Sequence, residues 1–163
     1  MNQCIVRPAV VSDAESAVAV LRDSITYLCV ADHQNDPSTL QRWLQNKTTD
    51  NFSQWLQDSE RHFVVAELNS EVCGVGMVRN SGDLDLCYIQ PGKERLGIGA
   101  AMLHALEAQA ARWRLSKLQL ISTANARGFY EHHGYVFTGE QSVPGYGVVR
   151  DYYYEKALST KSV

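Results

Sequence analysis

One stretch, residues 86–103, constrains the fold more than any other part of the chain. It reads LCYIQPGKERLGIGAAML, so an apolar run is interrupted by Pro91-Gly92, and Gly97-x-Gly99 then opens a helical pattern. Glycine at such a turn lets the backbone come close to a ligand. The first turn of a helix also has free N–H groups and a partial positive charge. The stretch therefore predicts a strand, a tight loop and a helix whose N-terminus can bind phosphate or pyrophosphate.

Two well-known phosphate-binding patterns do not fit this loop. The Walker pattern needs Gly-Lys-Ser/Thr, but Gly99 is followed by two alanines. The dinucleotide pattern G-x-G-x-x-G fails because Met102 occupies the place of the last glycine. Lys93 and Arg95 still add two cations at the rim. A plain strand-to-helix turn without a ligand remains open at this point.

The order of periodic segments predicts a mixed α/β sheet with helices on both faces. Helices are expected after a capping box formed by Ser12 and Glu15, after Asp36-Pro37, and around residues 52–56, 98–114 and 124–133. Strands are expected at residues 3–7, 63–67, 72–78, 84–89, 118–122, 135–138 and 151–156. The second and third strands form a hairpin around Asn69-Ser70.

Length and composition favour one ordinary domain over residues 1–163. The net charge of −3 and pI of about 5.9 argue against a general nucleic-acid binder. Apolar runs are too short for a membrane span, and the N-terminus has no signal-peptide pattern, so we expect a cytoplasmic protein. The cysteines at positions 4, 29, 73 and 87 form no C-x-x-C pair, so no metal site is expected.

The glycine loop resembles the acetyl-CoA loop of the GNAT superfamily of N-acetyltransferases. That loop has the pattern Q/R-x-x-G-x-G/A after a strand, with a proline three residues earlier, and this chain matches it at Pro91, Gly97 and Gly99. It departs at Glu94, where the family has Gln or Arg. A carboxylate would repel a pyrophosphate, so we expect Glu94 to point to solvent and Arg95 to take the basic role.

A second motif, residues 122–137, also resembles the family. STANARGFYEHHGYVF has the family's short helix with an aromatic pair, Phe129-Tyr130, followed by Gly-aromatic. The family often has Asn seven residues before this Tyr, where this chain has Thr123 and its Asn follows at 125. Either residue can supply that contact to CoA. The resemblance implies the GNAT fold: a single mixed, mostly antiparallel sheet of six to seven strands.

The resemblance further implies that the chain transfers the acetyl group of acetyl-CoA to a primary amine, by direct attack in a ternary complex. The alternative is a catalytically silent CoA-binding or sensor module, which Glu94 and the displaced Asn favour. Backbone N–H groups near Tyr88 and Ile89 are candidates for polarising the carbonyl. The resemblance assigns acetyl-CoA binding to Tyr88, Ile89, Lys93, Arg95, Leu96, Gly97, Ile98, Gly99, Ala100, Thr123, Asn125 and Tyr130.

Two side chains are candidates for proton transfer. Tyr130 is the candidate acid, because a phenol with a pKa near 10 is protonated at neutral pH and can donate to the departing thiolate. Asp83 is the candidate base, because relatives that acetylate histones carry Glu at the matching position; Asp85 points to the same face. Both carboxylates also suit a turn or a solvent-facing strand, and an amine can lose its proton through water.

The acceptor is predicted only as a small-molecule or peptide amine. We expect the N-terminal helices and the Gly-rich loop 139–149 to recognise it. Asp32, His33 and Asp36 in the polar segment 29–37 are candidates to attract a cationic amine, although capping of a surface loop explains them equally well. The run of tyrosines at 152–154 alternates between faces, so one ring is expected in the core and another at a wall. Many relatives are dimers, so a homodimer is also implied.

Overall fold

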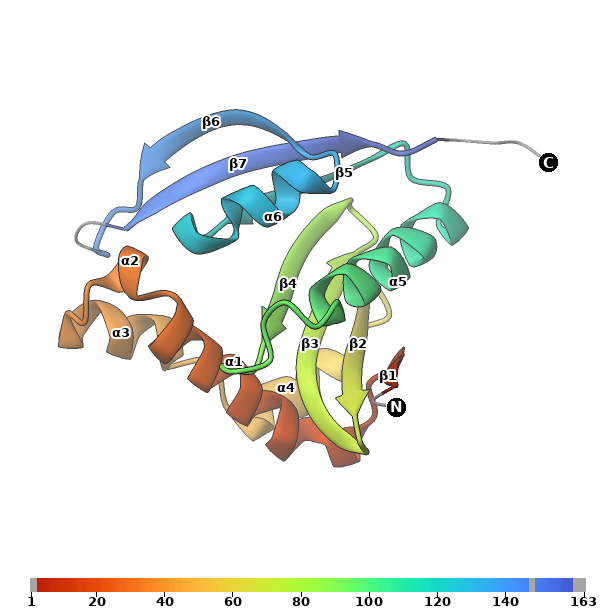
Figure 1. Cartoon of the computed structure of the whole chain (residues 1–163), viewed down its shortest axis with the longest axis horizontal. Coiled ribbons are helices and arrows are strands. Elements are labelled where there is room, and N and C mark those ends of the chain that lie inside the picture. Colours follow the sequence, from red (N-terminus) through yellow and green to blue (C-terminus); the bar gives the residue numbers. More distant parts are fainter. Residues whose placement is uncertain (1–2, 147–148, 160–163) are drawn as a thin grey trace.

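A computed structural model describes residues 3–146 and 149–159 of the chain. Its strands are β1 (Cys4–Pro8), β2 (Arg61–Leu68), β3 (Glu71–Arg79), β4 (Asp83–Ile89), β5 (Lys117–Ser122), β6 (Val136–Ser142) and β7 (Arg150–Ala157) (Figure 1). Its helices are α1 (Ala14–Leu28), α2 (Val30–His33), α3 (Pro37–Leu44), α4 (Thr49–Leu56), α5 (Ile98–Arg112) and α6 (Arg127–His132). Two short 3₁₀ turns, η1 (Val11–Asp13) and η2 (Ala124–Ala126), precede α1 and α6.

The seven strands of the described residues form a single sheet in the order β1-β2-β3-β4-β5-β7-β6. Every neighbouring pair is antiparallel except β4 and β5, which are parallel. The predicted fold class, a mixed and mostly antiparallel sheet with helices, is therefore confirmed.

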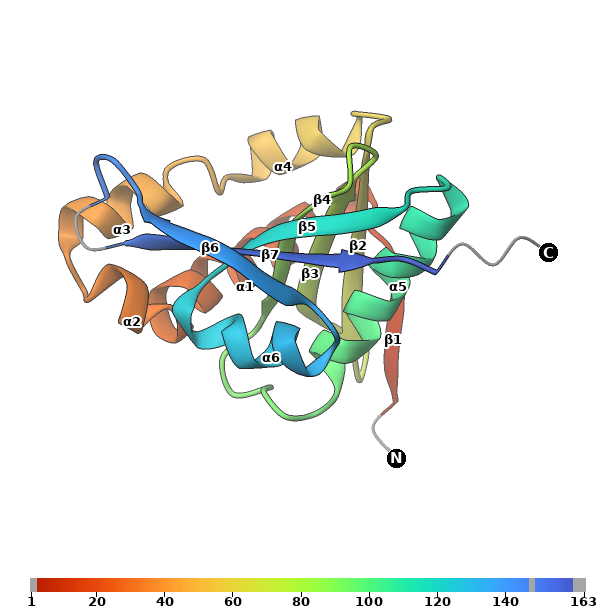
Figure 2. The same cartoon turned by 90° about the horizontal axis from the view of Figure 1, so that it is seen from above.

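The sheet opens between its two parallel strands. β4 and β5 pair only at Asp83↔Gln119 and Leu84↔Leu120, while β4 continues to Ile89. The pairing of β3 with β4 is regular over its far end and shifts register between Met77 and Val78. Figure 2 shows the result: β5, β6 and β7 run in a clearly different direction from β2, β3 and β4. The carboxyl-terminal half of β4 therefore faces an opening on its β5 side.

Helices cover the two faces of the sheet with separate apolar cores. On one face, α1 and α4 pack on the middle strands, where Leu21 and Phe52 of the helices share a core with Val75 of β3. On the other face, α5 packs through Met102 and Leu106. The hydrophobic effect drives both layers, since these side chains are almost completely removed from water. The two cores hold β4 and the start of α5 in fixed positions beside the opening.

The start of the first long helix differs from the sequence prediction. The capping box expected between Ser12 and Glu15 does not form, because Ser12 lies inside η1 and α1 begins at Ala14. Asp13 closes the turn instead: its carboxylate accepts the Val10 N–H at 2.8 Å. The segment 29–37 also differs, since it contains the short helix α2. By contrast, Asp36 caps α3 as expected, accepting the Thr39 N–H at 3.0 Å.

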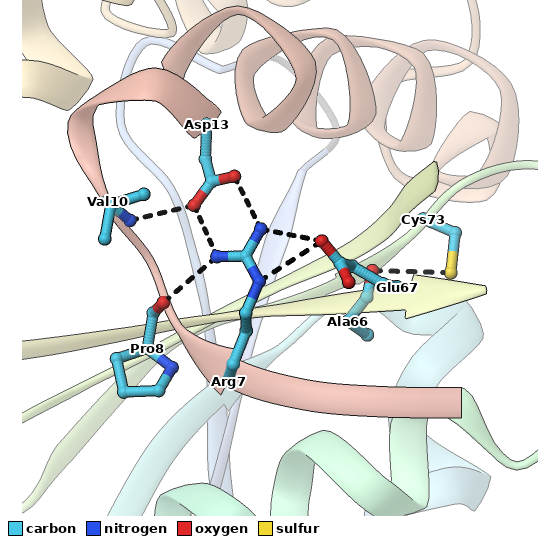
Figure 3. A network of polar contacts seen from close by, with 7 residues as sticks. All are labelled: Arg7, Pro8, Val10, Asp13, Ala66, Glu67 and Cys73. Carbon is cyan, nitrogen blue, oxygen red and sulfur yellow. Dashed lines mark hydrogen bonds and ion pairs between the residues drawn. The ribbon is translucent and has the colours of Figure 1, made fainter. Parts of the chain in front are cut away.

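A partly buried ion network explains why Asp13 takes this position (Figure 3). The guanidinium of Arg7 on β1 donates to both oxygens of Asp13 at 2.8 Å and to Glu67 on β2 at 2.8 and 3.2 Å. The hydrogen bond from Arg7 holds the pKa of Asp13 below its usual value, although burial works in the opposite direction. The network ties the first strand, the first turn and the second strand together.

Across residues 3–146 and 149–159, no helix has both the length and the apolar character needed to cross a membrane.

Candidate active site

A cavity of about 590 Å³ lies at the opening of the sheet. Its walls come from α1, β4 from Leu84 to Ile89, the loop and first turn of α5, the end of β5, and α6. Ten of the residues that the sequence assigned to the cofactor line it together: Tyr88, Ile89, Arg95, Gly97, Ile98, Gly99, Ala100, Thr123, Asn125 and Tyr130. The fold thus gathers two motifs that are separated in the sequence into one concave site.

The N-terminus of α5 points free N–H groups at this cavity. Gly97 precedes the helix in a left-handed conformation (φ 80°), and no side chain caps the helix. The Ala101 N–H bonds back to the Gly97 carbonyl at 3.1 Å, so the earlier N–H groups of the first turn have no partner within the helix. These donors and the positive end of the helix dipole suit a phosphate or pyrophosphate.

Gly99 joins the two motifs. A Cβ at position 99 would lie 3.2 Å from the ring of Phe129, which is tighter than ordinary contact. Phe129 in turn packs on Tyr130, with ring centroids 5.2 Å apart. A glycine at 99 therefore lets the helix that carries Tyr130 approach the start of α5.

The exposed edge of β4 supplies further backbone donors. Gln90 donates its N–H to the Cys73 carbonyl of β3 at 2.8 Å. Successive N–H groups of a strand point to opposite edges, so those of Ile89 and Cys87 point away from β3. β5 diverges before it can pair with them. The N–H groups of Ile89 and Cys87 thus face the opening and suit a carbonyl oxygen or an amide of a ligand.

Tyr130 is a buried phenol on the wall of the cavity. Only 6% of its surface is exposed, and its hydroxyl lies beside the thiol of Cys87. Burial, together with the neighbouring Cys87, Tyr88 and Tyr135, raises the pKa of Tyr130 well above its usual value. The hydroxyl therefore stays protonated across the neutral range and can act only as a proton donor there.

Thr123 and Asn125, which the sequence left as alternatives, belong to one unit. The Thr123 hydroxyl donates to the Asn125 side-chain oxygen at 2.7 Å, and both residues line the cavity. The amide nitrogen of Asn125 keeps its two donors for a ligand. Cys29, a buried thiol at the end of α1, lies beside Thr123 and also lines the cavity. No motif in the sequence signals Cys29 or Cys87 as a wall residue.

Three residues assigned from the sequence lie away from this cavity. Lys93 and Leu96 belong to the loop but do not line it. Asp83 lies on another groove. Its carboxylate accepts hydrogen bonds from the Ser81 hydroxyl at 2.7 Å and from the Gln119 side-chain amide at 2.8 Å. Partial burial works to raise the pKa of Asp83, but these hydrogen bonds and the charge of Arg79 outweigh it and lower the pKa. The geometry gives Asp83 no contact with a reacting group in the main cavity.

Three polar residues lie at the margin of the cavity or outside it: Glu94, His132 and His133. Glu94 is exposed, yet it also forms part of the cavity rim, so its pointing away from a bound pyrophosphate stays a prediction. His132 is exposed on α6, whereas His133 lines the cavity and packs edge-on against Phe129, with centroids 4.7 Å apart.

A second, smaller cavity of about 320 Å³ adjoins the first. The two cavities share Tyr88, Ile121 and Thr123. The second one extends toward α2, α3 and the segment between β6 and β7. Its residues Trp43 and Tyr146 were not singled out by the sequence, because a single aromatic on a helix or in a loop gives no distinctive signal. A molecule in the second cavity would lie next to a ligand in the first.

Solved structures share this fold along nearly the whole chain. A GCN5-related N-acetyltransferase from Rhodopseudomonas palustris superposes with a TM-score of 0.84 at 22% identity, covering 97% of this chain and 98% of the other. PaiA N-acetyltransferase from Thermoplasma acidophilum, solved with coenzyme A, gives 0.78 at 16% identity over 96% and 99%. YncA from Salmonella typhimurium, solved with acetyl-CoA, gives 0.74 at 17% identity over 99% and 97%. These likenesses define the fold as that of the GNAT class.

Sequence comparison agrees. The family model for the acetyltransferase (GNAT) domain matches residues 20–148. Uncharacterized N-acetyltransferases of Mycobacterium tuberculosis and Mycobacterium bovis are 27% identical over 104 residues, covering 60% of this chain and 67% of theirs. The chain therefore belongs to the GNAT family of acetyltransferases, as its two motifs predicted.

Proposed function

We propose that this chain transfers the acetyl group of acetyl-CoA to a primary amine by direct attack in a ternary complex. One observation carries the proposal. A single cavity joins the uncapped N-terminus of α5, the unpaired N–H groups of β4 and the protonated hydroxyl of Tyr130. These are the groups that a bound CoA thioester and its transfer require.

Acetyl-CoA fits the cavity as the donor substrate. Its pyrophosphate would lie on the free N–H groups from Ile98 to Ala100, with Arg95 at the rim. Its pantetheine arm would follow the open edge of β4, where amide groups of the arm replace the missing strand. Thr123 and Asn125 face the same space. The CoA and acetyl-CoA complexes of the T. acidophilum and S. typhimurium proteins support this assignment.

The proposed chemistry is one acyl transfer. The neutral amine nitrogen attacks the thioester carbonyl carbon, a C–N bond forms and the C–S bond breaks. The N–H groups of Cys87 and Ile89 are placed to stabilise charge on the carbonyl oxygen. The sulfur leaves with the bonding pair and takes the proton of the Tyr130 hydroxyl. The phenol regains a proton from solvent as the amine loses one, so Asp83 is not needed as a base.

Release of free thiol from acetyl-CoA tests the proposal. Purified protein is mixed with acetyl-CoA and one amine at a time, with amines of several classes. Release of thiol is followed against a control that contains acetyl-CoA but no amine. We expect at least one amine to give thiol and acetylated product in equal amounts. Tight acetyl-CoA binding with no turnover of any amine would instead favour the silent CoA-binding module. Absence of acetyl-CoA binding would overturn both.

A further inference from the structure

The second cavity contains one carboxylate that is almost completely buried. Asp32 on α2 is only 4% exposed. Its two oxygens share one backbone N–H, that of Ala124, at 2.9 and 3.2 Å. Burial raises the pKa of Asp32, although the Ala124 N–H and the nearby His33 work against this. A carboxylate has about four acceptor positions, so Asp32 keeps capacity for a further donor from the cavity.

Its polar neighbours in the segment 29–37 are occupied elsewhere. His33 is fully buried: one ring nitrogen bonds the Ile25 carbonyl at 2.9 Å and the other accepts the Asn35 N–H at 3.0 Å. Asp36 caps α3 by accepting from Thr39. The sequence left two roles open for the carboxylates of this segment: attraction of a cationic amine and capping of a surface loop. Asp36 has the capping role, and Asp32 faces the cavity.

The rest of the cavity wall is mainly aromatic and aliphatic. Trp43, Tyr88 and Tyr146 line it with Val143 and Val149. Trp43 is held edge-on by His33, with ring centroids 6.2 Å apart.

Arg42, on α3, contacts the segment that carries Tyr146. Its guanidinium donates to the Gly145 carbonyl and lies 5.9 Å from the centre of the Tyr146 ring. Figure 1 shows α2 and α3 near the end of β6 and the start of β7, between which Gly145 and Tyr146 lie in the chain. Arg42 therefore links α3 to the segment that carries Tyr146.

The charges around the cavity favour a cation. Asp151, at the start of β7, is a second carboxylate on the wall; burial raises its pKa despite a 3.4 Å hydrogen bond from the Tyr153 hydroxyl. Arg150 also lines the cavity, but its guanidinium is paired with Glu140 at 2.9 Å. A ligand carboxylate would meet Asp32 and Asp151, whereas an ammonium group would be attracted by both.

From this arrangement we propose that the acceptor is a small primary amine with one positive charge and a flat apolar body, of the arylalkylamine class. Its ammonium group is attracted to Asp32 and gives up a proton to solvent before the neutral nitrogen attacks, and its ring packs against the aromatic wall of the second cavity. The inference rests on the proposed function and narrows it. A polyamine would leave the apolar walls unfilled. An amino acid would place its carboxylate near Asp32 and Asp151.

Matched amines test the class of acceptor. 2-Phenylethylamine, L-phenylalanine, butylamine and spermidine are compared by kcat/KM at fixed acetyl-CoA. L-Phenylalanine differs from 2-phenylethylamine by a carboxylate, and butylamine lacks the ring. We expect 2-phenylethylamine to exceed each of the others by about tenfold or more. Equal or better turnover of L-phenylalanine or spermidine would overturn the inference.

Substitutions at Asp32 and Tyr146 test the roles of these residues in binding the amine. Asp32→Asn keeps an oxygen for the Ala124 N–H and removes only the charge. It should raise the KM for 2-phenylethylamine about tenfold or more and leave acetyl-CoA affinity within a few-fold. Tyr146→Ala should reduce the preference for 2-phenylethylamine over butylamine. Asp36→Asn is the matched control and should leave both constants unchanged. An unchanged KM in Asp32→Asn, or an equal loss in Asp36→Asn, would contradict the assignment.

Calorimetry separates failure of this inference from failure of the proposed function. Acetyl-CoA is titrated into the wild-type protein and into Asp32→Asn. 2-Phenylethylamine is then titrated into both proteins, each with and without CoA. Acetyl-CoA binding without saturable amine binding would overturn the arylalkylamine site and leave acetyl transfer standing. Absence of acetyl-CoA binding would overturn the proposed function, while Asp32-dependent amine binding in the same samples would still support the cavity assignment.

Discussion

At the scale of single residues, the proposal depends most on Tyr130. Its ring is fixed by Phe129 and Tyr135, with centroids 5.2 and 5.6 Å away, and its hydroxyl is the only part that the proposed chemistry uses. The phenol is weakly acidic in this site, which keeps the proton available until a thiolate forms. Removal of the hydroxyl is therefore a clean test of its role.

Tyr130→Phe should lower kcat and kcat/KM alike by about a hundredfold or more, because a general acid acts only in the transition state. Acetyl-CoA affinity should stay within a few-fold, since the pyrophosphate site lies elsewhere in the cavity. Steady-state kinetics with the preferred amine and calorimetry with acetyl-CoA measure the two effects. Tyr27→Phe, on an exposed ring of α1, is the control. A near-wild-type kcat with chemistry rate-limiting would make Tyr130 a packing residue.

Gly97→Glu should abolish acetyl-CoA binding measured by calorimetry. The new carboxylate would lie at the N-terminus of α5, where it would compete with the pyrophosphate for the helix N–H groups. Gly92→Glu is the matched control, because Gly92 has a similar positive φ of 88° and open space around it but does not line the cavity. Equal affinities of folded Gly97→Glu and wild-type protein would place the donor elsewhere.

Glu94→Gln should change acetyl-CoA affinity by less than about threefold at physiological salt. Glu94 lies on the rim, but its exposed charge is screened by water and ions. Titrations at low and at physiological salt provide the measurement. A gain of about tenfold at low salt would show that the carboxylate faces the pyrophosphate.

At the scale of elements, the Arg7 network makes a prediction about stability. Arg7→Met should lower the free energy of unfolding by roughly 1–3 kcal/mol, because it leaves the buried Asp13 carboxylate without its cation. The pKa of Asp13 is lowered in the folded protein, so its contribution is present above the unfolded pKa of about 3.9. That contribution is lost as pH falls through the lower folded pKa. The difference between wild type and variant should therefore shrink below about pH 4.

Urea unfolding at several pH values measures this difference. Lys117→Met, which removes an exposed ion pair with Glu155, is the control and should cost no more than about 0.5 kcal/mol. A stability difference that stays constant from pH 7 to pH 3 would contradict the role given to Asp13.

The elements that the sequence predicted well are those with strong local signals. The helix from Ile98 and the turn at Asn69-Ser70 follow from helical periodicity and from residues that tolerate positive φ, which are 53° and 66° here. The capping box at Ser12 failed for a non-local reason. Arg7 comes from β1 and is also hydrogen-bonded to Glu67 on β2, and its hydrogen bonds to Asp13 outweigh the local preference. Local pattern alone does not contain that competition.

At the scale of the whole molecule, the opened sheet brings the two cavities together. The motif residues Gly97, Gly99 and Tyr130 could be assigned from the sequence because their spacing resembles a family pattern. The sequence also named Asp32 and the loop 139–149 as candidates for acceptor recognition. It could not show that they share a cavity, since Asp32, Tyr88 and Tyr146 come from segments that only the folded sheet brings close. The opening itself depends on where the β4–β5 pairing stops, between residues such as Asp83 and Gln119 that are 36 positions apart. No local signal sets that point.

The central claim is that acetyl-CoA binds at this opening, between β4 and the N-terminus of α5. Amide chemical shifts of the ¹⁵N-labelled protein, followed during titration with acetyl-CoA, test it most directly. The account predicts that the largest changes fall on the amides from Gly97 to Ala101 and on those of Cys87 and Ile89. Amides of β1 and of the Arg7 network, on the far edge of the sheet, should stay unchanged. Largest changes at that far edge, or no changes at saturating acetyl-CoA, would contradict the account.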